Sequence, residues 1–506
     1  MTVATQTLPV IGHVVGGKAI ETAARYQDVF NPASGRAVAR LALASKAETD
    51  AAVEVAHAAH RDWAATPVAK RAQVMFRFKV LLERDADRIC QAIALEHGKT
   101  VDDARGELGR GIEVVEYACG AGELLKGEHS KNVGPGIDAW SEFQPLGVVA
   151  GITPFNFPAM VPMWMFPMAL VCGNTFVLKP SERDPSASLI MAELLAEAGL
   201  PAGVFNVVNG DKEAVDALLA HPKVKAVSFV GSTPIAELIY KTATANGKRV
   251  QALGGAKNHA VVMPDADLDA AVSAMIGAAY GSAGERCMAL SVAVCVGDAV
   301  AEDLIAKLKP AIAAIKVGAA SQSGIDMGPV ITKASQEKIK GYVDAGVADG
   351  AELVVDGRAI AVEGHANGYF VGPCLLDKVT PEMSVYTDEI FGPVLCIVRV
   401  KTLHEAMDLI DAHEFGNGTC IFTRDGEAAR YFTDAIQVGM VGVNVPLPVP
   451  VAYHSFGGWK RSLFGDLHIY GPDSVRFYTR RKAITQRWPS SGIAEKTQFA
   501  FPNMAR

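Results

Sequence analysis

The stretch VKAVSFVGSTPIAELIYKTAT, at residues 224–244, decides the fold class. Val224–Val230 is a short run of β-branched and apolar residues, which is typical of a buried strand. A Gly-Ser turn follows, and Pro234 opens a predicted helix over Thr233–Thr244, because proline is favoured in a first helical turn. A strand that leads through a tight turn into a helix is half of a parallel βαβ unit.

The same alternation continues on both sides of this stretch. Before it, the sequence predicts strands at Val148–Ile152, Thr175–Leu178 and Val204–Val208 and helices at Leu189–Ala198 and Lys212–Ala220. After it, a second α/β region at about residues 260–445 has strands predicted at Ala260–Met263, Val292–Val296, Leu353–Val355, Leu395–Arg399, Thr419–Phe422 and Val441–Val445. Residues 46–130 are predicted to be helical, and Val475–Tyr478 and Ala483–Gln486 to be late strands. The fold class is therefore α/β, with a parallel sheet covered by helices on both faces.

The composition indicates a globular protein. Half of the 506 residues are apolar and a fifth are charged, and 48 Lys and Arg against 55 Asp and Glu give a net charge of −7. This mild acidity disfavours nucleic acid or an anionic membrane as a main partner. The longest apolar stretch, residues 155–178, holds three prolines, which favours a buried, turn-rich core segment over a membrane helix. Residues 1–20 show no secretory signal, so we expect a cytoplasmic protein.

Several familiar motifs are absent from the sequence. GxGxxG, GxSxG and HExxH do not occur, and GKT at residues 98–100 lacks the first glycine of a phosphate-binding loop. The eight cysteines are scattered and form no Cys-x-x-Cys pair. Neither a disulfide framework nor a metal site is therefore expected.

The segment TPFNFP, at residues 153–158, directly follows a predicted strand. Its two prolines would hold the side-chain amide of Asn156 in a rigid loop. A fixed amide donor suits the stabilisation of an oxyanion, although an ordinary turn asparagine fits the same pattern.

Two further segments are candidates for binding a nucleotide. In LKPSER, at residues 178–183, Lys179 at a strand end could bind ribose hydroxyls or phosphate, and a nearby acid could hold a 2′-hydroxyl and repel a 2′-phosphate. In FVGSTP, at residues 229–234, the start of the helix could offer amide donors to a phosphate. A solvated charged loop and an ordinary helix cap are the respective alternatives.

The segment GSAGERCMA, at residues 281–289, contains the candidate nucleophile Cys287. Its neighbours are small and polar, and Arg286 lies beside it in sequence. Because a cation next to a thiol favours the thiolate, this cysteine is predicted to be reactive. The other seven cysteines are predicted to be buried small hydrophobic residues.

Together with EIFGP at residues 389–393, these segments resemble, in the same order, the aldehyde dehydrogenase superfamily over about residues 10–490. The resemblance implies a Rossmann-like NAD-binding domain (residues 1–130 and 150–253) and an α/β catalytic domain (residues 254–445). It also implies a small β oligomerisation flap (residues 131–149 and 470–490), and a homodimer or homotetramer.

The resemblance also assigns roles to individual residues. Cys287 matches the family nucleophile and Asn156 its oxyanion donor. The positions that match the family's contacts to a nicotinamide cofactor are Thr153, Phe155, Lys179, Glu182, Ser232 and Glu389. Arg183 and Gly254 lie beside that set and are also candidates.

One departure from the hydrolytic members points to the reaction. The hydrolytic members have the segment Glu-Leu-Gly-Gly-Lys, whose Glu activates water. The corresponding segment here is QALGGAKNH, at residues 251–259, and its Ala252 is expected at the position of that Glu. Alanine cannot act as a general base, so hydrolysis of a thioester should be slow, whereas a thiol such as coenzyme A needs less help. This segment and NVPLPVP at residues 444–450 resemble the CoA-acylating branch, the methylmalonate-semialdehyde dehydrogenases.

A carboxylated substrate requires a cationic clamp, because an unpaired buried carboxylate is costly. Arg286 and Arg110 are the candidates, the second because the branch places an Arg there. The predicted reaction is NAD-dependent oxidation of malonate or methylmalonate semialdehyde with decarboxylation to acetyl-CoA or propionyl-CoA. Three alternatives remain, namely a hydrolytic dehydrogenase, a cysteine hydrolase with His259 as base, and a protein without catalytic activity.

Overall fold

The stretch at residues 224–244 folds into strand β11 (Val224–Val230) and helix α9 (Thr233–Ala245), as predicted. In the computed structural model, which describes residues 8–488, β11 lies inside an eight-stranded sheet. The other strands of this first sheet are β2 (His13–Val15), β3 (Lys18–Ile20), β8 (Val148–Ile152), β9 (Thr175–Lys179), β10 (Phe205–Val207), β12 (Arg249–Leu253) and β22 (Leu463–Phe464). Their order is β22-β12-β11-β8-β9-β10-β2-β3, and the five strands from β12 to β10 pair in parallel.

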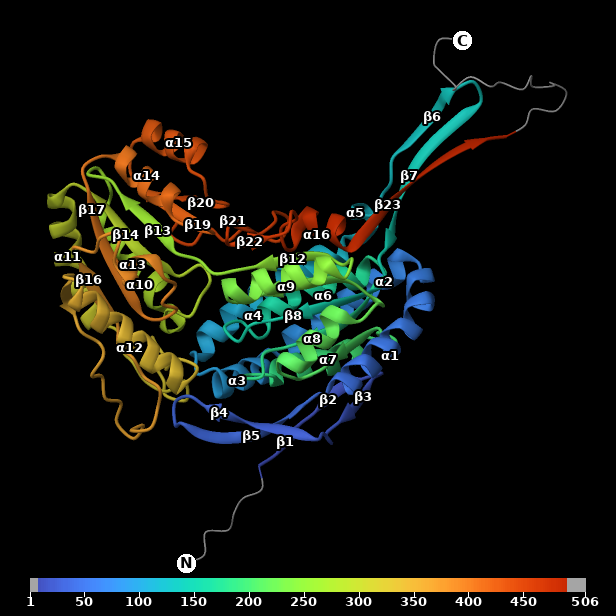
Figure 1. Cartoon of the computed structure of the whole chain (residues 1–506), viewed down its shortest axis with the longest axis horizontal. Helices are drawn as coiled ribbons and strands as arrows, with labels where there is room; N and C mark the ends of the chain where they lie inside the picture. Colours follow the sequence, from blue (N-terminus) through green and yellow to red (C-terminus); the bar gives the residue numbers. More distant parts are fainter. Residues whose placement is uncertain (1–7, 489–506) are drawn as a thin grey trace, which may run out of the picture.

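Helices cover both faces of the first sheet, as predicted for an α/β fold (Figure 1). Helices α1 (Lys46–Ala65), α8 (Lys212–Ala220) and α9 pack on one face. On the other face lie α2 (Val68–Arg84), α3 (Ala86–Glu96), α4 (Val101–Cys119), α5 (Ala121–Leu124), α6 (Met160–Val171) and α7 (Ser186–Glu197). Strands buried on both faces explain why β8 and β11 are almost continuously apolar in sequence.

A second sheet stands beside the first (Figure 1). It runs in the order β15-β16-β17-β14-β13-β19-β20 and is parallel except for the pair β15 and β16. Its strands are β13 (Asn258–Val262), β14 (Leu290–Val296), β15 (Glu352–Val355), β16 (Cys374–Asp377), β17 (Val394–Val400), β19 (Gly418–Phe422) and β20 (Met440–Val443). Its helices are α10 (Leu268–Tyr280), α11 (Asp298–Ala313), α12 (Lys333–Ala348), α13 (Ser384–Thr387), α14 (Leu403–Ala412) and α15 (Gly426–Ala435).

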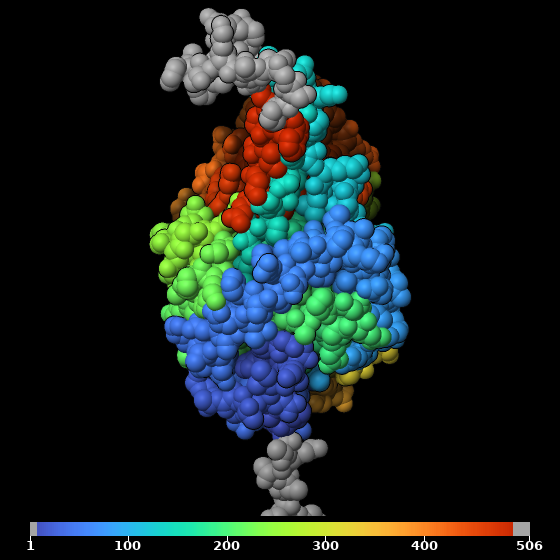
Figure 2. Space-filling model, turned by 90° about the vertical axis from the view of Figure 1, so that its right-hand side faces the viewer, coloured from blue at the N-terminus to red at the C-terminus, as the bar shows by residue number. Residues whose placement is uncertain are grey.

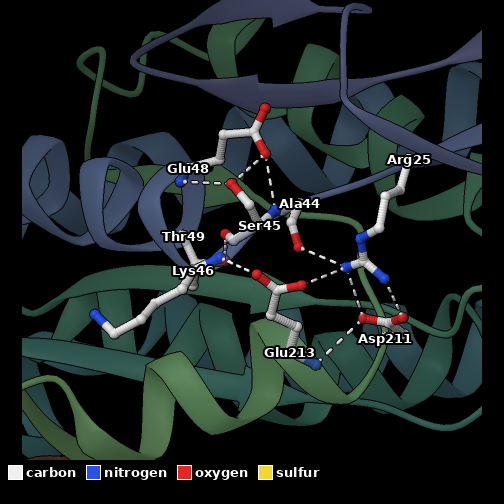
Figure 3. Close-up of polar contacts among 8 residues, drawn as sticks. All are labelled: Arg25, Ala44, Ser45, Lys46, Glu48, Thr49, Asp211 and Glu213. Carbon is white, nitrogen blue, oxygen red and sulfur yellow. Dashed lines mark hydrogen bonds and ion pairs between the residues drawn. The ribbon is translucent and has the colours of Figure 1, made fainter.

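An N-terminal β-structure, which the sequence did not predict, lies against the first sheet. Strands β1 (Val10–Ile11), β4 (Arg25–Asn31) and β5 (Arg36–Leu43) form a three-stranded sheet, and a separate pair joins β18 (Phe415–Gly416) to β21 (Trp459–Lys460). Figure 3 shows how the hairpin is attached: the Arg25 guanidinium reaches Asp211, at 2.7 and 3.1 Å, and Glu213, at 2.9 Å, at the start of α8. These partners are partly exposed, so the ion pairs contribute orientation more than stability.

A β-arm projects from the body of the molecule (Figures 1 and 2). It consists of β6 (His129–Gly134), β7 (Ile137–Pro145) and β23 (Thr479–Arg487), and β23 pairs with β7 over its whole length. The arm and the expected flap, residues 131–149 and 470–490, have different limits, because β6 begins at His129 and residues 148–149 belong to β8 of the first sheet. Residues 1–7 of the first predicted domain and residues 489–490 of the flap lie outside the described residues.

The strand predicted at Val475–Tyr478 is wrong, because these residues end helix α16 (Gly471–Tyr478). Valine, phenylalanine and tyrosine favour strands in isolation. The buried positions, however, are Gly471, Ser474, Val475 and Tyr478, together with Phe477, and the first four have the spacing of one helical face. Packing of this face against the body outweighs the local preference.

The apolar stretch at residues 155–178 is buried as predicted, but it contains a helix rather than only turns. All twelve residues of α6 are buried. Pro162 is the third residue of the helix, where the missing N–H has no intrahelical partner, so only Pro167 removes a helical hydrogen bond. Within residues 8–488, no helix is both long enough and apolar enough to cross a membrane.

The capping box of α1 provides a test of how the first domain is stabilised (Figure 3). The Ser45 hydroxyl accepts a hydrogen bond from the Glu48 N–H at 3.3 Å, and the Glu48 carboxylate accepts one from the Ser45 N–H at 2.7 Å. Ser45→Ala should lower the free energy of unfolding by about 1 kcal/mol, measured by guanidinium denaturation. Ser323→Ala, in an exposed loop, serves as the control and should leave it unchanged.

Candidate active site

A cavity of about 430 Å³ lies at the carboxyl ends of β8, β9 and β11. Ligands in α/β folds bind at this edge of a parallel sheet. Eight of the twelve predicted site residues line it: Thr153, Phe155, Asn156, Lys179, Ser232, Gly254, Cys287 and Glu389. Six separate segments of the sequence therefore meet at one cavity.

The cavity wall carries two hydroxyl groups that could bind a ligand, those of Thr153 and Ser232. The Thr153 hydroxyl is buried without a hydrogen bond in the described part of the chain. Ser232 is the N-cap of α9, yet its hydroxyl makes no capping bond, and the helix start faces the cavity. Gly254 leaves no room for a side chain, since a Cβ there would lie 2.7 Å from the Arg461 carbonyl oxygen. Such a wall fits a ligand rich in hydroxyl and phosphate groups.

Lys179 and Glu182 form an ion pair beside this wall, with 3.1 Å between ammonium and carboxylate. Burial raises the pKa of Glu182, but Lys179 and hydrogen bonds outweigh it, so the pKa lies below its usual value and the carboxylate is charged. Lys179 lines the cavity and Glu182 stands next to it. The predicted candidate Arg183 instead borders a separate cavity of about 210 Å³ that also holds Glu96.

A strained turn carries the candidate nucleophile. Ser282, Ala283 and Gly284 all have left-handed backbone angles, with φ of 53°, 52° and 71°. A Cβ at Gly284 would lie 2.2 Å from the Gly392 carbonyl oxygen, so only glycine fits there. Strain of this kind is typical of functional sites whose geometry is imposed by the surroundings.

Two asparagine amides hold the backbone of Cys287. Asn258 Nδ2, from β13, and Asn417 Nδ2, next to β19, each donate to the Cys287 carbonyl oxygen at 3.0 Å. The N–H groups of Cys287 and Met288 face the sulfur. The nucleophile is thus fixed by the second sheet. No local sequence pattern would have identified these two asparagines.

The predicted effect of Arg286 on Cys287 is outweighed in this structure. Burial, and after it the nearby Glu389 carboxylate, raise the pKa of the thiol to about 12, although Arg286 acts to lower it. The Arg286 guanidinium instead pairs with Asp103 of α4 at 2.5 Å. Adjacency in sequence did not place the cation next to the sulfur.

Arg110 is also paired within the protein rather than free in the cavity. Its guanidinium lies 2.6 Å from Glu113 and donates to the Pro450 carbonyl oxygen at 2.6 Å. Like Arg286, it does not line the main cavity. A substrate carboxylate would therefore have to exchange with an existing partner at either arginine.

The position predicted for the missing general base requires a correction. Ala252 of β12 packs in the apolar cluster that includes α9. Leu253, the next residue, belongs to the cluster on the opposite face of the sheet, against which Cys287 packs. Since strand side chains alternate between faces, Leu253 and not Ala252 faces the Cys287 side. The chemical conclusion survives, because neither side chain can take up a proton.

His259 is not arranged as a base for Cys287. Its Nε2 lies 3.1 Å from the Tyr386 hydroxyl, and its ring packs at 5.5 Å from the ring of His413. Burial holds the pKa of His259 well below its usual value. This geometry disfavours the cysteine hydrolase alternative. Residues 8–488 bring together no group of three or more His, Cys, Asp or Glu side chains that could hold a metal ion.

Helix α12 completes the cavity from the second sheet, which the sequence did not predict. Ser335, Lys338 and Ile339 line the wall opposite β8 and β9. Glu389 lies near them, and its carboxylate accepts a hydrogen bond from the Ala256 N–H at 2.9 Å. Burial raises the pKa of Glu389.

Comparisons with known proteins agree with this geometry. Residues 20–484 match the model of the aldehyde dehydrogenase family. The chain is 68% identical to a malonate-semialdehyde dehydrogenase of Pseudomonas aeruginosa over 97% of its length and 99% of the relative's. It is also similar to a methylmalonate-semialdehyde dehydrogenase structure from Oceanimonas doudoroffii, with 68% identity, a TM-score of 0.95, and coverage of 96% and 99% of the two chains. A Sinorhizobium meliloti 1021 protein solved in complex with NAD is 55% identical, with a TM-score of 0.95 and coverage of 96% and 100%.

The raised pKa of Cys287 predicts its reactivity with pH. Below a pKa of about 12 the thiolate fraction rises tenfold for each pH unit. Inactivation of the ligand-free protein by iodoacetamide should therefore accelerate about tenfold per unit from pH 7 to 9, without a plateau. Mass spectrometry of Cys287→Ser corrects for labelling elsewhere. A plateau with a midpoint below pH 9 would show that an unrecognised cation stabilises the thiolate.

Proposed function

Because this chain belongs to the aldehyde dehydrogenase family, we propose that it is an NAD-dependent, CoA-acylating dehydrogenase of malonate or methylmalonate semialdehyde. The products would be carbon dioxide and acetyl-CoA or propionyl-CoA. One observation carries the proposal: Cys287 and Asn156 share a cavity with the residues expected to bind NAD, and the strand beside them offers no acidic side chain.

The residues of the cavity fit NAD. Lys179 and Glu182 would hold the adenosine ribose, Thr153 and Ser232 the phosphates, and Glu389 the nicotinamide ribose. The charged Glu182 would favour a 2′-hydroxyl over a 2′-phosphate, and therefore NAD over NADP. NAD, when bound, accepts the hydride that leaves the aldehyde carbon.

The chain's own groups perform the first half of the reaction. Cys287 loses its proton to solvent and its sulfur attacks the aldehyde carbon, forming a C–S bond while the π pair of the C=O bond moves to the oxygen, which gains negative charge. The Asn156 amide and the Cys287 N–H would bind this oxygen. When the hydride leaves, the C=O bond re-forms and Cys287 carries a thioester.

The second half depends on what β12 lacks. Leu253 cannot remove a proton from water, so the thioester persists until the CoA thiolate attacks it and Cys287 leaves as thiolate. The substrate carboxylate is β to the thioester carbonyl, so carbon dioxide can leave while that carbonyl accepts the electron pair, and the α-carbon then takes a proton. Arg110 or Arg286 would hold the carboxylate before it departs, exchanging it for Glu113 or Asp103.

The setting of the reaction is also part of the proposal. All eight cysteines are free, as expected in a reducing compartment, so we place the reaction in the cytoplasm. The arm of β6, β7 and β23 would pair with other subunits to form a homodimer or homotetramer. The first and second sheets would serve as the NAD-binding and catalytic domains.

The decisive experiment measures NADH formation from malonate semialdehyde with and without CoA, and identifies the product by mass. We expect one turnover per site without CoA, and steady turnover giving acetyl-CoA with it. Steady turnover to a free acid without CoA would replace the proposal with a hydrolytic dehydrogenase. Absence of NADH in both conditions would reject the redox assignment.

The correction at β12 gives a second prediction. Leu253→Glu should place a carboxylate on the Cys287 side and raise the CoA-independent rate at least about tenfold, because general-base catalysis contributes 10²–10⁴-fold in favourable geometry. Ala252→Glu, one residue away but on the opposite face, should leave that rate unchanged. The free acid released is quantified by chromatography. Equal gains in both variants would contradict the assignment of faces.

A further inference from the structure

A buried ion pair lies directly behind the loop that carries Asn156. The side chains of Lys99 and Glu107 are completely buried, with 2.8 Å between ammonium and carboxylate. Neither residue lines the main cavity, and neither has a role in the proposed reaction. Burying two charges rarely gains stability over an apolar pair of similar size. Their position therefore calls for another explanation.

The Lys99 ammonium has three partners, and two of these belong to the Asn156 loop. Besides Glu107, the ammonium donates to the Asn156 carbonyl oxygen at 2.6 Å. It also lies 4.3 Å from the centre of the Phe157 ring, a cation–π contact. The ammonium thus holds the peptide of the oxyanion donor and the aromatic side chain that follows it.

The carboxylate of the pair holds the other end of the same loop. Glu107 Oε1 accepts hydrogen bonds from the Ala159 N–H at 2.8 Å and the Met160 N–H at 3.1 Å, at the start of α6. An anion is favourable at a helix N-terminus. Within five residues, from Asn156 to Met160, four are therefore fixed by one ion pair.

We infer that Lys99, held in place by Glu107, is a positioning residue that sets the direction of the Asn156 side-chain amide through the Asn156 peptide. In the part of the chain that the structure describes, the Asn156 hydrogen bond is made by its backbone, so the side-chain amide is available to the cavity. A donor works on an oxyanion only if it is held in place before the reaction. The inference rests on the proposed attack by Cys287, but not on the identity of the substrate or of the acyl acceptor.

Two variants separate positioning from folding. Glu107→Gln removes the ion pair but keeps an acceptor for α6 and the Lys99 bond to the Asn156 carbonyl. Lys99→Met/Glu107→Gln removes the ion pair as well, leaves no buried charge, and additionally removes that bond. The two proteins differ only at Lys99, so a difference between them reports the contacts of its ammonium with the loop, namely the bond to the Asn156 carbonyl oxygen and the contact with the Phe157 ring.

The readout is the burst of NADH from propanal and NAD without CoA, a single turnover that follows Cys287 acylation. We expect Glu107→Gln to stay within about threefold of the unmodified protein and the double variant to fall 10- to 100-fold. Asn156→Ala should fall about 10²–10³-fold. In the Asn156→Ala background, the double variant should lower the rate of the NADH burst by less than about twofold. NAD binding, titrated by fluorescence, should stay within twofold in all variants.

The inference would be overturned if Glu107→Gln and the double variant lowered the rate of the NADH burst equally. It would also be overturned if the double variant lowered that rate as much in the Asn156→Ala background as it does in the unmodified protein. A second neutral pair, Lys99→Leu/Glu107→Gln, covers the case in which the first does not fold. If neither pair folds while Glu107→Gln does, the ammonium is a folding requirement and the positioning role is rejected. Absence of a burst in the unmodified protein would instead refute the proposed function.

Discussion

The chain crosses from the first sheet to the second at residues 254–257, and this crossing determines the site, because Asn258, which follows it directly, donates to the Cys287 carbonyl oxygen. Gly255 N–H donates to the Thr233 hydroxyl at 2.7 Å, which ties the crossing to α9 of the first sheet. Ala256 N–H donates to Glu389, which ties it to the second. A Cβ at Gly255 would lie 2.5 Å from the Glu389 carboxylate, so a side chain there would displace that carboxylate from its place in the site. Cavity walls from two separate folding units are thereby held at a fixed distance.

Burial at this junction sets the electrostatics of the site. It raises the pKa of Cys287 to about 12, so the thiol is protonated at neutral pH, and it also raises the pKa of Glu389. The Asn156 side chain is more enclosed than either, with 3% of the residue's surface exposed. A site of this kind strengthens a positioned hydrogen bond, since water does not compete for it. The charges that remain, at Lys99, Arg110 and Arg286, each have a carboxylate partner within the chain.

The parts predicted well from sequence are those that depend on local pattern. At residues 224–244 the local signals, an apolar run and a proline in the first helical turn, favour the same strand and helix that burial in the first domain stabilises. The motif residues Asn156, Cys287 and Glu389 meet because they belong to segments whose order resembles a known family. The failures lie where tertiary contacts decide. The Arg286 guanidinium pairs with Asp103, some 180 residues away in sequence, instead of lying next to the Cys287 sulfur. The last residues of α16 form a helix instead of a strand, because their buried side chains pack against the body at helical spacing. The sequence marked Lys99 only as a member of the GKT triplet at residues 98–100, which lacks the rest of a phosphate-binding loop. No local pattern indicates that its ammonium bonds to the carbonyl oxygen of Asn156.

The missing general base shows that a shift of one residue along a strand changes which side chain faces the reacting groups. Alignment by the glycines put Ala252 at the critical position, but β12 turns that side chain toward α9 and Leu253 toward the Cys287 side. A shift of one residue in a strand moves every side chain to the opposite face, so a motif that is right in composition can be wrong in position. In this chain both residues are apolar, and the face toward Cys287 carries no proton acceptor from β12. The thioester then reacts with the nucleophile that is already deprotonated without help from a base. Near neutral pH a far larger fraction of a thiol than of water is deprotonated, so the thiol is favoured.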